Sequence, residues 1–308
     1  MTTVTTRGIH LSCERLNRVL EAFGHPEQRL KVVRVGGTNG KGSVCACLAA
    51  ILHEAHYKVG TFNSPHLLEP RDSIAINGVP VDSASWAQLH KDIDTAESLH
   101  ITPLTNFERL TLCALVWFDR QQVDLAILEV GVGGRRDATS VCQRSALVSV
   151  LTSIGLDHVG LIGDTLTEIA EEKSGIINPG GVTIVAEQPY PEIVAVLKNA
   201  VDAMQPQEAL LVAPARRLTM LTDATTKDAI EDSPEILVSG NQYELDWSQR
   251  TDLRQPLSPR QQSPPSPTTE ARTPTRPPLV FRSPLLGSFQ LANFAAALHA
   301  VDALRRVY

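Results

Sequence analysis

The stretch Gly-Thr-Asn-Gly-Lys-Gly-Ser at positions 37–43 decides how the rest of the chain is read. An apolar run over 31–35 precedes it and an amphipathic run over 43–56 follows it, which predicts a buried strand, a glycine-rich turn and a helix. Glycines let the backbone approach an anion closely, while a helix N-terminus and one lysine attract negative charge. We therefore expect a phosphate-binding loop in which Lys41 reaches the β- and γ-phosphates of a nucleotide and the Ser43 hydroxyl faces Mg²⁺.

The spacing of this stretch differs from the common phosphate-loop motif. That motif has a glycine where Val35 stands, and a serine or threonine directly after the lysine, where Gly42 stands. A glycine-rich turn without a ligand is the alternative interpretation. The flanking strand and helix favour the phosphate loop.

Composition limits the classes of protein to consider. The 308 residues are 43% hydrophobic, enough for one large domain or two, and the net charge of −6 gives no basic footprint for nucleic acid. No apolar run reaches the roughly 18–20 residues of a membrane span, and the N-terminus lacks the apolar centre of a signal peptide. The cysteines include no Cys-x-x-Cys pair, which favours free thiols in a reducing compartment. We expect a cytoplasmic protein, with a mitochondrial pool as the alternative, and neither a membrane nor a nucleic-acid partner.

Periodicity predicts alternating helices and strands, hence an α/β fold with a mostly parallel sheet flanked by helices. Expected strands lie over 58–62, 71–78, 124–130, 146–152 and 181–186, and expected helices over 11–23, 83–99, 106–121, 164–173, 191–204 and 285–307. Asp164 is the expected N-cap of the fourth helix. Short runs over 210–212, 235–238 and 242–247 are expected to form edge hairpins. The proline-rich segment 250–284 cannot bury enough apolar surface to order itself and is expected to be a disordered insertion.

Polar side chains follow two of these strands. Glu129 ends a nearly continuous apolar run, and Ser64 comes just after the 58–62 strand. Carboxyl ends of parallel strands meet at one edge of a sheet, where ligands collect. An unpaired carboxylate is costly to bury, so Glu129 predicts a cation partner, Mg²⁺. For Ser64 alone, an ordinary structural loop is the alternative.

Three further residues could have a structural role as well as a role in a binding site. Thr105 and Glu108 fit a helix capping box, which by itself explains both residue types. Lys173 near a helix C-terminus is explained by a solvated charge that interacts with the helix dipole.

Several segments together resemble the Mur ligase superfamily, and within it the dihydrofolate synthase and folylpolyglutamate synthase branch. They are the 37–43 stretch, Ser-Pro-His-Leu at 64–67, Gly-Val-Gly-Gly-Arg-Arg-Asp-Ala-Thr at 131–139, and the pair Gln290 and Asn293. Asp-Ser at 72–73 is most similar to fungal dihydrofolate synthases. Two residues depart from the family pattern: Arg136 stands where leucine is usual, and Phe289 stands where histidine is common.

The resemblance implies the roles of individual residues. It implies catalytic roles for Lys41, His158 and Lys173, the last as a carbamate, and Mg²⁺ ligands at Ser64, Glu129 and His158. ATP contacts are implied for Thr38, Asn39, Gly40, Lys41, Gly42, Ser43, Gln290 and Asn293. Pterin contacts are implied for Thr105, Phe107, Glu108, Asp137 and Ala138.

The implied reaction is ATP-dependent ligation of L-glutamate to dihydropteroate through an acyl phosphate, by a monomer. Asn39 favours dihydrofolate synthesis, and polyglutamation of a reduced folate is the alternative. We expect an ATP-binding Mur-ligase-like domain over 1–249, completed by a final helix over 285–308. The family's second domain has no counterpart in the sequence, so an ATP-binding remnant without ligase activity is another alternative. A different phosphate-loop ATPase or GTPase is disfavoured by the loop spacing and by the lack of an Asn-Lys-x-Asp motif.

Overall fold

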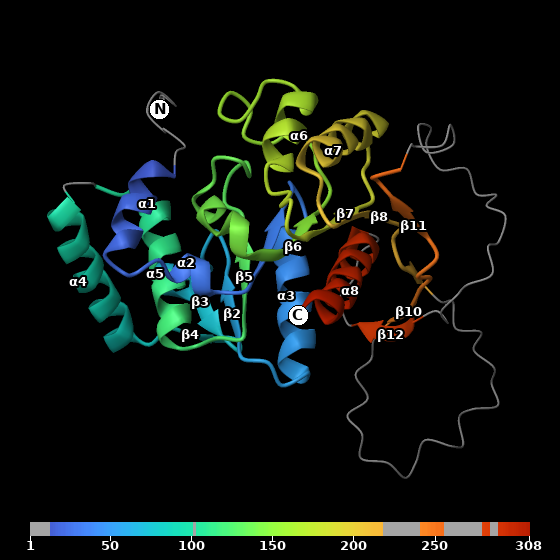
Figure 1. The fold of residues 1–308 in the computed structure, drawn as a ribbon. Coiled ribbons are helices and arrows are strands. Elements are labelled where there is room, and N and C mark those ends of the chain that lie inside the picture. Colours follow the sequence, from blue (N-terminus) through green and yellow to red (C-terminus); the bar gives the residue numbers. More distant parts are fainter. Residues whose placement is uncertain (1–12, 101–102, 218–240, 256–278, 284–288) are drawn as a thin grey trace, which may run out of the picture.

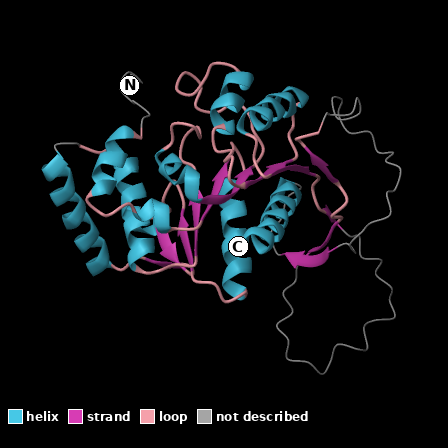
Figure 2. Ribbon diagram, in the orientation of Figure 1, coloured by secondary structure: helices cyan, strands magenta, loops and turns pink. Residues whose placement is uncertain are grey.

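A nine-stranded sheet forms the centre of the computed structural model, which describes residues 13–100, 103–217, 241–255, 279–283 and 289–308 (Figures 1 and 2). Adjacent strands run parallel from one side of the sheet to the other, in the order β8 (Glu208–Val212), β7 (Val182–Ala186), β6 (Ala146–Leu151), β1 (Val32–Gly36), β5 (Leu125–Glu129) and β2 (Val59–Phe62). Antiparallel strands close both edges: β11 (Arg250–Asp252) pairs with β8, and β3 (Ile74–Ile76) and β4 (Val79–Pro80) follow β2. The expected mostly parallel α/β sheet is confirmed.

Helices cover both faces of this sheet because its parallel strands are apolar on both sides. One face packs against α3 (Lys41–Glu54) and α8 (Phe289–Val307). The other face is divided along the sheet. One half is covered by α1 (Glu14–Glu21), α2 (Pro26–Arg29), α4 (Ser83–His100) and α5 (Asn106–Arg120), and the other by α6 (Leu166–Ser174) and α7 (Pro191–Met204). Two 3-10 helices, η1 (Pro70–Ser73) and η2 (Ala138–Ser145), lie in the connections.

A second, three-stranded antiparallel sheet contains β12 (Leu279–Ser283), β10 (Asn241–Leu245) and β9 (Arg216–Arg217). Leu245 in β10 and Trp247 just after it belong to the same apolar cluster as α8. The segment 250–284, expected to be a disordered insertion, contains β11 near its start and β12 near its end, so the structure corrects its bounds. Residues 256–278 of that segment, and the strand expected over 235–238, lie outside the described residues.

Two local predictions are corrected by hydrogen bonds that short patterns do not reveal. The expected edge strand over 210–212 is part of β8, which pairs in parallel with β7 inside the main sheet. The N-cap of α6 is Thr165 rather than Asp164, because the Thr165 hydroxyl accepts a hydrogen bond from the Glu168 amide at 3.2 Å. The Glu168 carboxylate accepts in return from the amides of Asp164 and Thr165, which completes a capping box.

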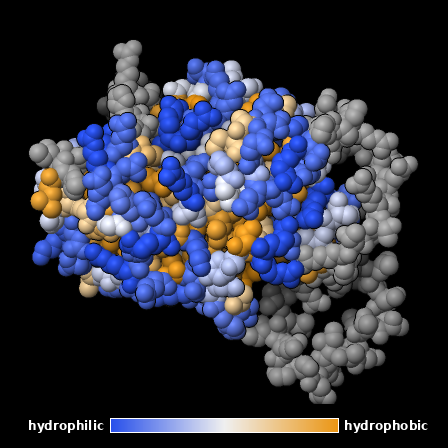
Figure 3. Space-filling view, viewed as in Figure 1, coloured by the Kyte–Doolittle hydropathy of each residue, from blue (hydrophilic) through white to orange (hydrophobic). Residues whose placement is uncertain are grey.

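The surface, the helices and the cysteines can be compared with what the composition predicts. The face shown in Figure 3 is mainly hydrophilic, with separate hydrophobic patches. Among the described residues, no helix combines the length and the apolar character that crossing a membrane requires. The five cysteines are free thiols, as expected.

Gly60 in β2 is a position where a side chain has no room. A Cβ built on Gly60 would lie 2.6 Å from the Phe118 ring of α5. We expect Gly60→Ala to lower the free energy of unfolding by about 1–3 kcal/mol through overpacking, measured by denaturant titration. Gly180→Ala is the control, because its Cβ would meet only ordinary contacts with Asn178 at 3.8 Å or more. Equal unfolding midpoints for the two variants would contradict the packing assignment.

Candidate active site

The glycine-rich stretch forms a turn between β1 and α3 at the carboxyl edge of the sheet. β1 ends at Gly36 and α3 begins at Lys41, so the helix amides face outward from the sheet edge as in an anion site. Gly40 adopts the left-handed region with φ of 93°, and a Cβ there would lie 2.2 Å from the Asn293 Oδ1. The Asn293 amide in turn donates to the Gln290 Oε1 at 3.0 Å. The pair expected on α8 therefore lies against the phosphate loop, although 247 positions separate Gln290 from Ser43 (290 − 43).

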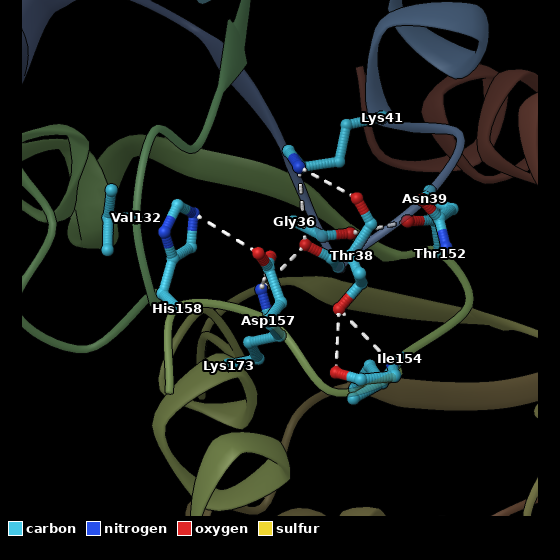
Figure 4. A network of polar contacts seen from close by, with 12 residues as sticks. Gly36, Thr38, Asn39, Lys41, Val132, Thr152, Ile154, Asp157, His158 and Lys173 are labelled. Atoms are coloured by element: carbon cyan, nitrogen blue, oxygen red, sulfur yellow. Dashed lines mark hydrogen bonds and ion pairs between the residues drawn. The ribbon is translucent and has the colours of Figure 1, made fainter. Parts of the chain in front are cut away.

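The Lys41 side chain folds back over the loop. Its Nζ donates to the carbonyl oxygens of Gly37 at 3.4 Å and Thr38 at 3.1 Å (Figure 4). Neutral carbonyls are weak partners for an ammonium compared with a phosphate oxygen. The same side chain is therefore placed to exchange these contacts for a phosphate group bound in the turn.

The first half of the loop is tied to the segment after β6. The amides of Thr38 and Asn39 both donate to the Ser153 carbonyl, at 2.9 and 3.3 Å. The Thr38 hydroxyl donates to the Gly155 carbonyl and accepts from its amide, each at 3.1 Å. The amides from Gly40 onward are the ones that remain to face a phosphate.

Glu129 and Ser64 meet at the ends of neighbouring strands, as the sequence predicts. The Glu129 Oε2 accepts a hydrogen bond from the Ser64 amide at 3.4 Å, and it lies close to Gly42 at the start of α3. Burial raises the pKa of Glu129, while the positive charge of Lys41 and the Ser64 amide act in the opposite direction. A buried carboxylate with one long hydrogen bond, beside a phosphate loop, fits a divalent cation.

Lys173 points into the protein, so the solvated-charge interpretation is wrong. Its side chain is 2% exposed, and its Nζ donates to the Gly37 carbonyl at 2.8 Å and to the Asp157 Oδ2 at 3.2 Å (Figure 4). Burial lowers the pKa of Lys173, the negative Asp157 opposes this, and the nearby Lys41 lowers the pKa further. Lys173 thus joins α6 to the phosphate loop, and Asp157 holds its ammonium from the other side.

His158 lies at the outer end of this network. Its Nε2 is 3.4 Å from the Asp157 Oδ1, and its side chain is 40% exposed. Among the described residues, Asp157 is the one side chain in polar contact with its imidazole, which forms no hydrogen bond with Ser64 or Glu129. No group of three His, Cys, Asp or Glu side chains that could hold a metal occurs in the described part of the chain. The Mg²⁺ ligation by His158 therefore stays a prediction.

The residues expected to contact a pterin lie around the loop after β5, and most have internal partners. Thr105 and Glu108 form the expected capping box of α5, and Arg15 pairs with Glu108 at 3.2 Å. The Phe107 ring lies 5.7 Å from the Phe62 ring, centre to centre, and its atoms crowd the Gly131 backbone.

Asp137 and Ala138 are both buried. The Asp137 Oδ2 accepts from the amides of Gly131 and Val132, each at 3.1 Å, and its Oδ1 accepts from the amide and hydroxyl of Thr139. Asp137 thus shapes the loop with all of these contacts, and a pterin contact by it stays a prediction.

Comparison with known families agrees with this geometry. A model of the Mur ligase middle domain matches residues 35–203, more than half of the chain. The chain belongs to the Mur ligase family.

Relatives of this Mur ligase chain have names from folate metabolism. A Bacillus subtilis protein named dihydrofolate synthase/folylpolyglutamate synthase is 36% identical over 200 residues, which cover 63% of this chain and 46% of the relative. Saccharomyces cerevisiae dihydrofolate synthetase is 36% identical over 198 residues, with 64% and 46% covered. The structure of Mycobacterium tuberculosis folylpolyglutamate synthase complexed with ADP superimposes with a TM-score of 0.72 at 25% identity, covering 97% of this chain and 59% of that one. The chain thus spans about half the length of the curated relatives it matches.

Sequence reasoning missed several residues that the Mur ligase fold brings to the site. Ser153 accepts from two loop amides through its backbone carbonyl and donates its hydroxyl to the Asn39 carbonyl at 3.4 Å, contacts that no sequence pattern reveals. Glu172 accepts from the amide and side chain of Arg136, the residue that departs from the family pattern. Arg34 is fully buried in β1, and a charged residue inside an apolar strand is the sequence signal that marks it.

Replacing Gly40 tests the loop geometry of this Mur ligase domain. We expect Gly40→Ala to weaken ATP binding by roughly tenfold or more, because a left-handed non-glycine residue costs about 1–3 kcal/mol and the new methyl group displaces Asn293. Isothermal titration with ATP measures the change. Gly155→Ala is the matched control, since its Cβ would meet nothing within 4 Å. An unchanged affinity in Gly40→Ala would show that the turn does not bind the phosphates.

Proposed function

We propose that this chain is the ATP-binding part of a ligase that joins L-glutamate to dihydropteroate and gives dihydrofolate. The observation that carries the proposal is the meeting of Lys41, Glu129 and Ser64 at one edge of the sheet, beside a turn built for phosphate. The dihydrofolate synthase names of its relatives supply the substrate class. Since the chain spans about half of those relatives, the complete activity is part of the proposal.

The nucleotide is proposed to bind with its phosphates over the turn. Lys41 leaves the carbonyls of Gly37 and Thr38 to contact the β- and γ-phosphates, and the amides from Gly40 to Ser43 surround them. Gln290 and Asn293 are proposed to contact ATP from α8, which already packs on Gly40. Thr38 and Asn39 support the turn through Ser153.

Ser64, Glu129 and His158 would hold Mg²⁺ in this proposal. The ion would neutralise charge on the phosphates and align them for transfer. Glu129 has the buried, sparsely bonded carboxylate that this role needs. Lys173 is proposed to carry the carbamate that the family resemblance implies, and its lowered pKa favours the neutral amine that can form one.

The proposed reaction needs charge neutralisation and alignment more than covalent help from the protein. A carboxylate oxygen of dihydropteroate attacks the γ-phosphorus of ATP, the bond to ADP breaks, and an acyl phosphate forms. The amine of L-glutamate then attacks the acyl carbon, phosphate leaves, and the amine loses a proton. Lys41 stabilises the charge on the transferred group, and the 131–139 loop and Phe107 lie on the acceptor side.

Polyglutamation is the second candidate, favoured by the relatives named folylpolyglutamate synthase. In that reaction the acceptor is a reduced folate instead of dihydropteroate. We propose a cytoplasmic monomer for either activity, with a mitochondrial pool as the alternative.

The acceptor and the lysine can be tested together. With ATP, Mg²⁺, L-glutamate and dihydropteroate, the purified 308-residue protein is expected to release ADP, and Lys41→Ala is expected to lose about 10²-fold or more of that rate, because one catalytic charge contact is removed. Lys198→Ala, which removes a helical ion pair with the exposed Asp202, is the control. A coupled ADP assay measures the rates.

The outcomes of this assay separate the candidates. Turnover with a reduced folate but not with dihydropteroate moves the assignment to polyglutamation. No turnover with either acceptor, in a folded protein that binds ATP, would overturn the proposal that this chain acts as a ligase by itself. Wild-type turnover in Lys41→Ala would show that the lysine of the phosphate loop does not take part in the reaction.

The proposed metal role of Glu129 predicts a defect confined to Mg²⁺. We expect Glu129→Gln to reduce the gain in ADP affinity that Mg²⁺ provides by roughly tenfold or more, because a neutral amide is a poor Mg²⁺ ligand. ADP affinity without Mg²⁺ should change little. Asp124→Asn is the matched control, since Asp124 is an exposed carboxylate at the opposite end of the same strand. A full Mg²⁺ effect in Glu129→Gln would exclude this carboxylate as a ligand.

A further inference from the structure

Arg34 is a charged residue in the middle of the sheet. It lies in β1, three positions before the phosphate loop, and has no exposed surface. Its neighbours Val33 and Val35 pack against α3 and α8. Since side chains alternate along a strand, the Arg34 guanidinium points to the opposite face, beneath the loop that follows β5.

The guanidinium is held by neutral groups. It donates to the Gln143 Oε1 at 3.0 Å, to the Gly134 carbonyl at 3.1 Å and to the Thr139 hydroxyl at 3.3 Å. No carboxylate of the described residues forms a direct ion pair with it, and its Nε has no partner there. A buried charge with such partners is costly for stability, so packing alone is a weak reason for its presence.

One arm of this network leads to the residues just after Glu129. The Thr139 hydroxyl, which accepts from Arg34, donates to the Asp137 Oδ1 at 2.6 Å. The Asp137 Oδ2 accepts from the amides of Gly131 and Val132. Arg34 therefore supports the 131–139 loop along its length. It bonds directly to Gly134 and Thr139, and through Thr139 and Asp137 it reaches the amides at the start of the loop.

The other arm leads to the helix that carries Lys173. Gln143, the third partner of Arg34, donates to the Ile177 carbonyl at 2.7 Å, just beyond the end of α6. Gly134 also packs on α6, because a Cβ at that position would lie 2.8 Å from the Lys173 carbonyl. The buried guanidinium thus lies where the loop and the C-terminal end of α6 meet.

We propose that Arg34 is a positioning residue that holds the 131–139 loop in the conformation that receives the acceptor substrate. The inference rests on the proposed function, which assigns this loop to the acceptor side of the site. In the described structure no hydrogen bond of the Arg34 side chain reaches the phosphate loop, which Ser153, Asn293 and Lys173 contact instead. Replacing Arg34 should therefore weaken binding of the acceptor substrate and leave binding of the nucleotide largely unchanged.

Two substitutions separate positioning from general packing. Arg34→Met keeps much of the volume but removes the charge and all donors. Replacing buried ionic groups by apolar groups of similar volume is often neutral for stability, so this variant is expected to fold. Arg34→Lys keeps the charge but lacks the planar fork that reaches three acceptors at once. Arg29→Met is the matched control, because Arg29 pairs with Asp119 at the surface.

Hydrogen–deuterium exchange on the full chain tests the positioning itself and needs no activity. In Arg34→Met, the amides of segment 130–140 are expected to exchange roughly tenfold faster or more, because the hydrogen bonds that fix them are lost. Segment 44–54 in α3 and the melting temperature are expected to match the wild type. Unchanged exchange in 130–140, or faster exchange in every segment with a lower melting temperature, would overturn the proposal.

Steady-state kinetics test the consequence for the substrate. The KM for the pteroate or folate acceptor is expected to rise roughly tenfold or more in Arg34→Met, with the KM for ATP within about twofold of wild type, and Arg34→Lys is expected to be intermediate. Equal changes for both substrates would overturn the acceptor assignment. A wild-type protein without turnover would count against the proposed function alone, and the exchange result would then decide the role of Arg34.

Discussion

Two lysine side chains converge on one backbone oxygen, and much of the site depends on this arrangement. Lys173 from α6 and Lys41 from α3 both donate to the Gly37 carbonyl, at 2.8 and 3.4 Å. Like charges this close repel each other, and Lys41 contributes to the lowered pKa of Lys173. Asp157 offsets part of this charge from one side. A bound polyphosphate would offset the rest, so the phosphate loop is arranged for an anion before one arrives.

The rest of the fold positions the charged side chains around the phosphate loop. The parallel strands bring their carboxyl ends to one edge, where the Glu129 carboxylate, the Ser64 amide and the phosphate turn meet. From one face, α8 presses Asn293 against Gly40. From the other face, α6 delivers Lys173, and the loop after β5 packs on α6 through Gly134. The site is therefore built from segments that are distant in sequence, and its geometry is a property of the whole sheet.

The buried Arg34 supports the loop that, in the proposed function, lies on the acceptor side of the site. Its hydrogen bonds reach the 131–139 loop and, through Gln143, the end of α6. The phosphate turn is contacted by Ser153, by the Asn293 side chain and, from α6, by the Lys173 ammonium at the Gly37 carbonyl.

The sequence by itself determined the strand–turn–helix around Lys41, the order of most helices and strands, and the placing of Ser64 and Glu129 at one sheet edge. These follow from local periodicity and from the rule that ligands collect at the carboxyl ends of parallel strands. Only the tertiary structure decided the rest. It buried Lys173, which looked like a solvated helix-end charge, and it engaged both oxygens of Asp137 within its own loop. In the tertiary structure, the amides of Thr38 and Asn39 donate to Ser153, and strands form at both ends of the proline-rich segment. The backbone partners of Lys173, Thr38 and Asn39 lie more than a hundred positions away in the sequence, so a local pattern cannot identify them.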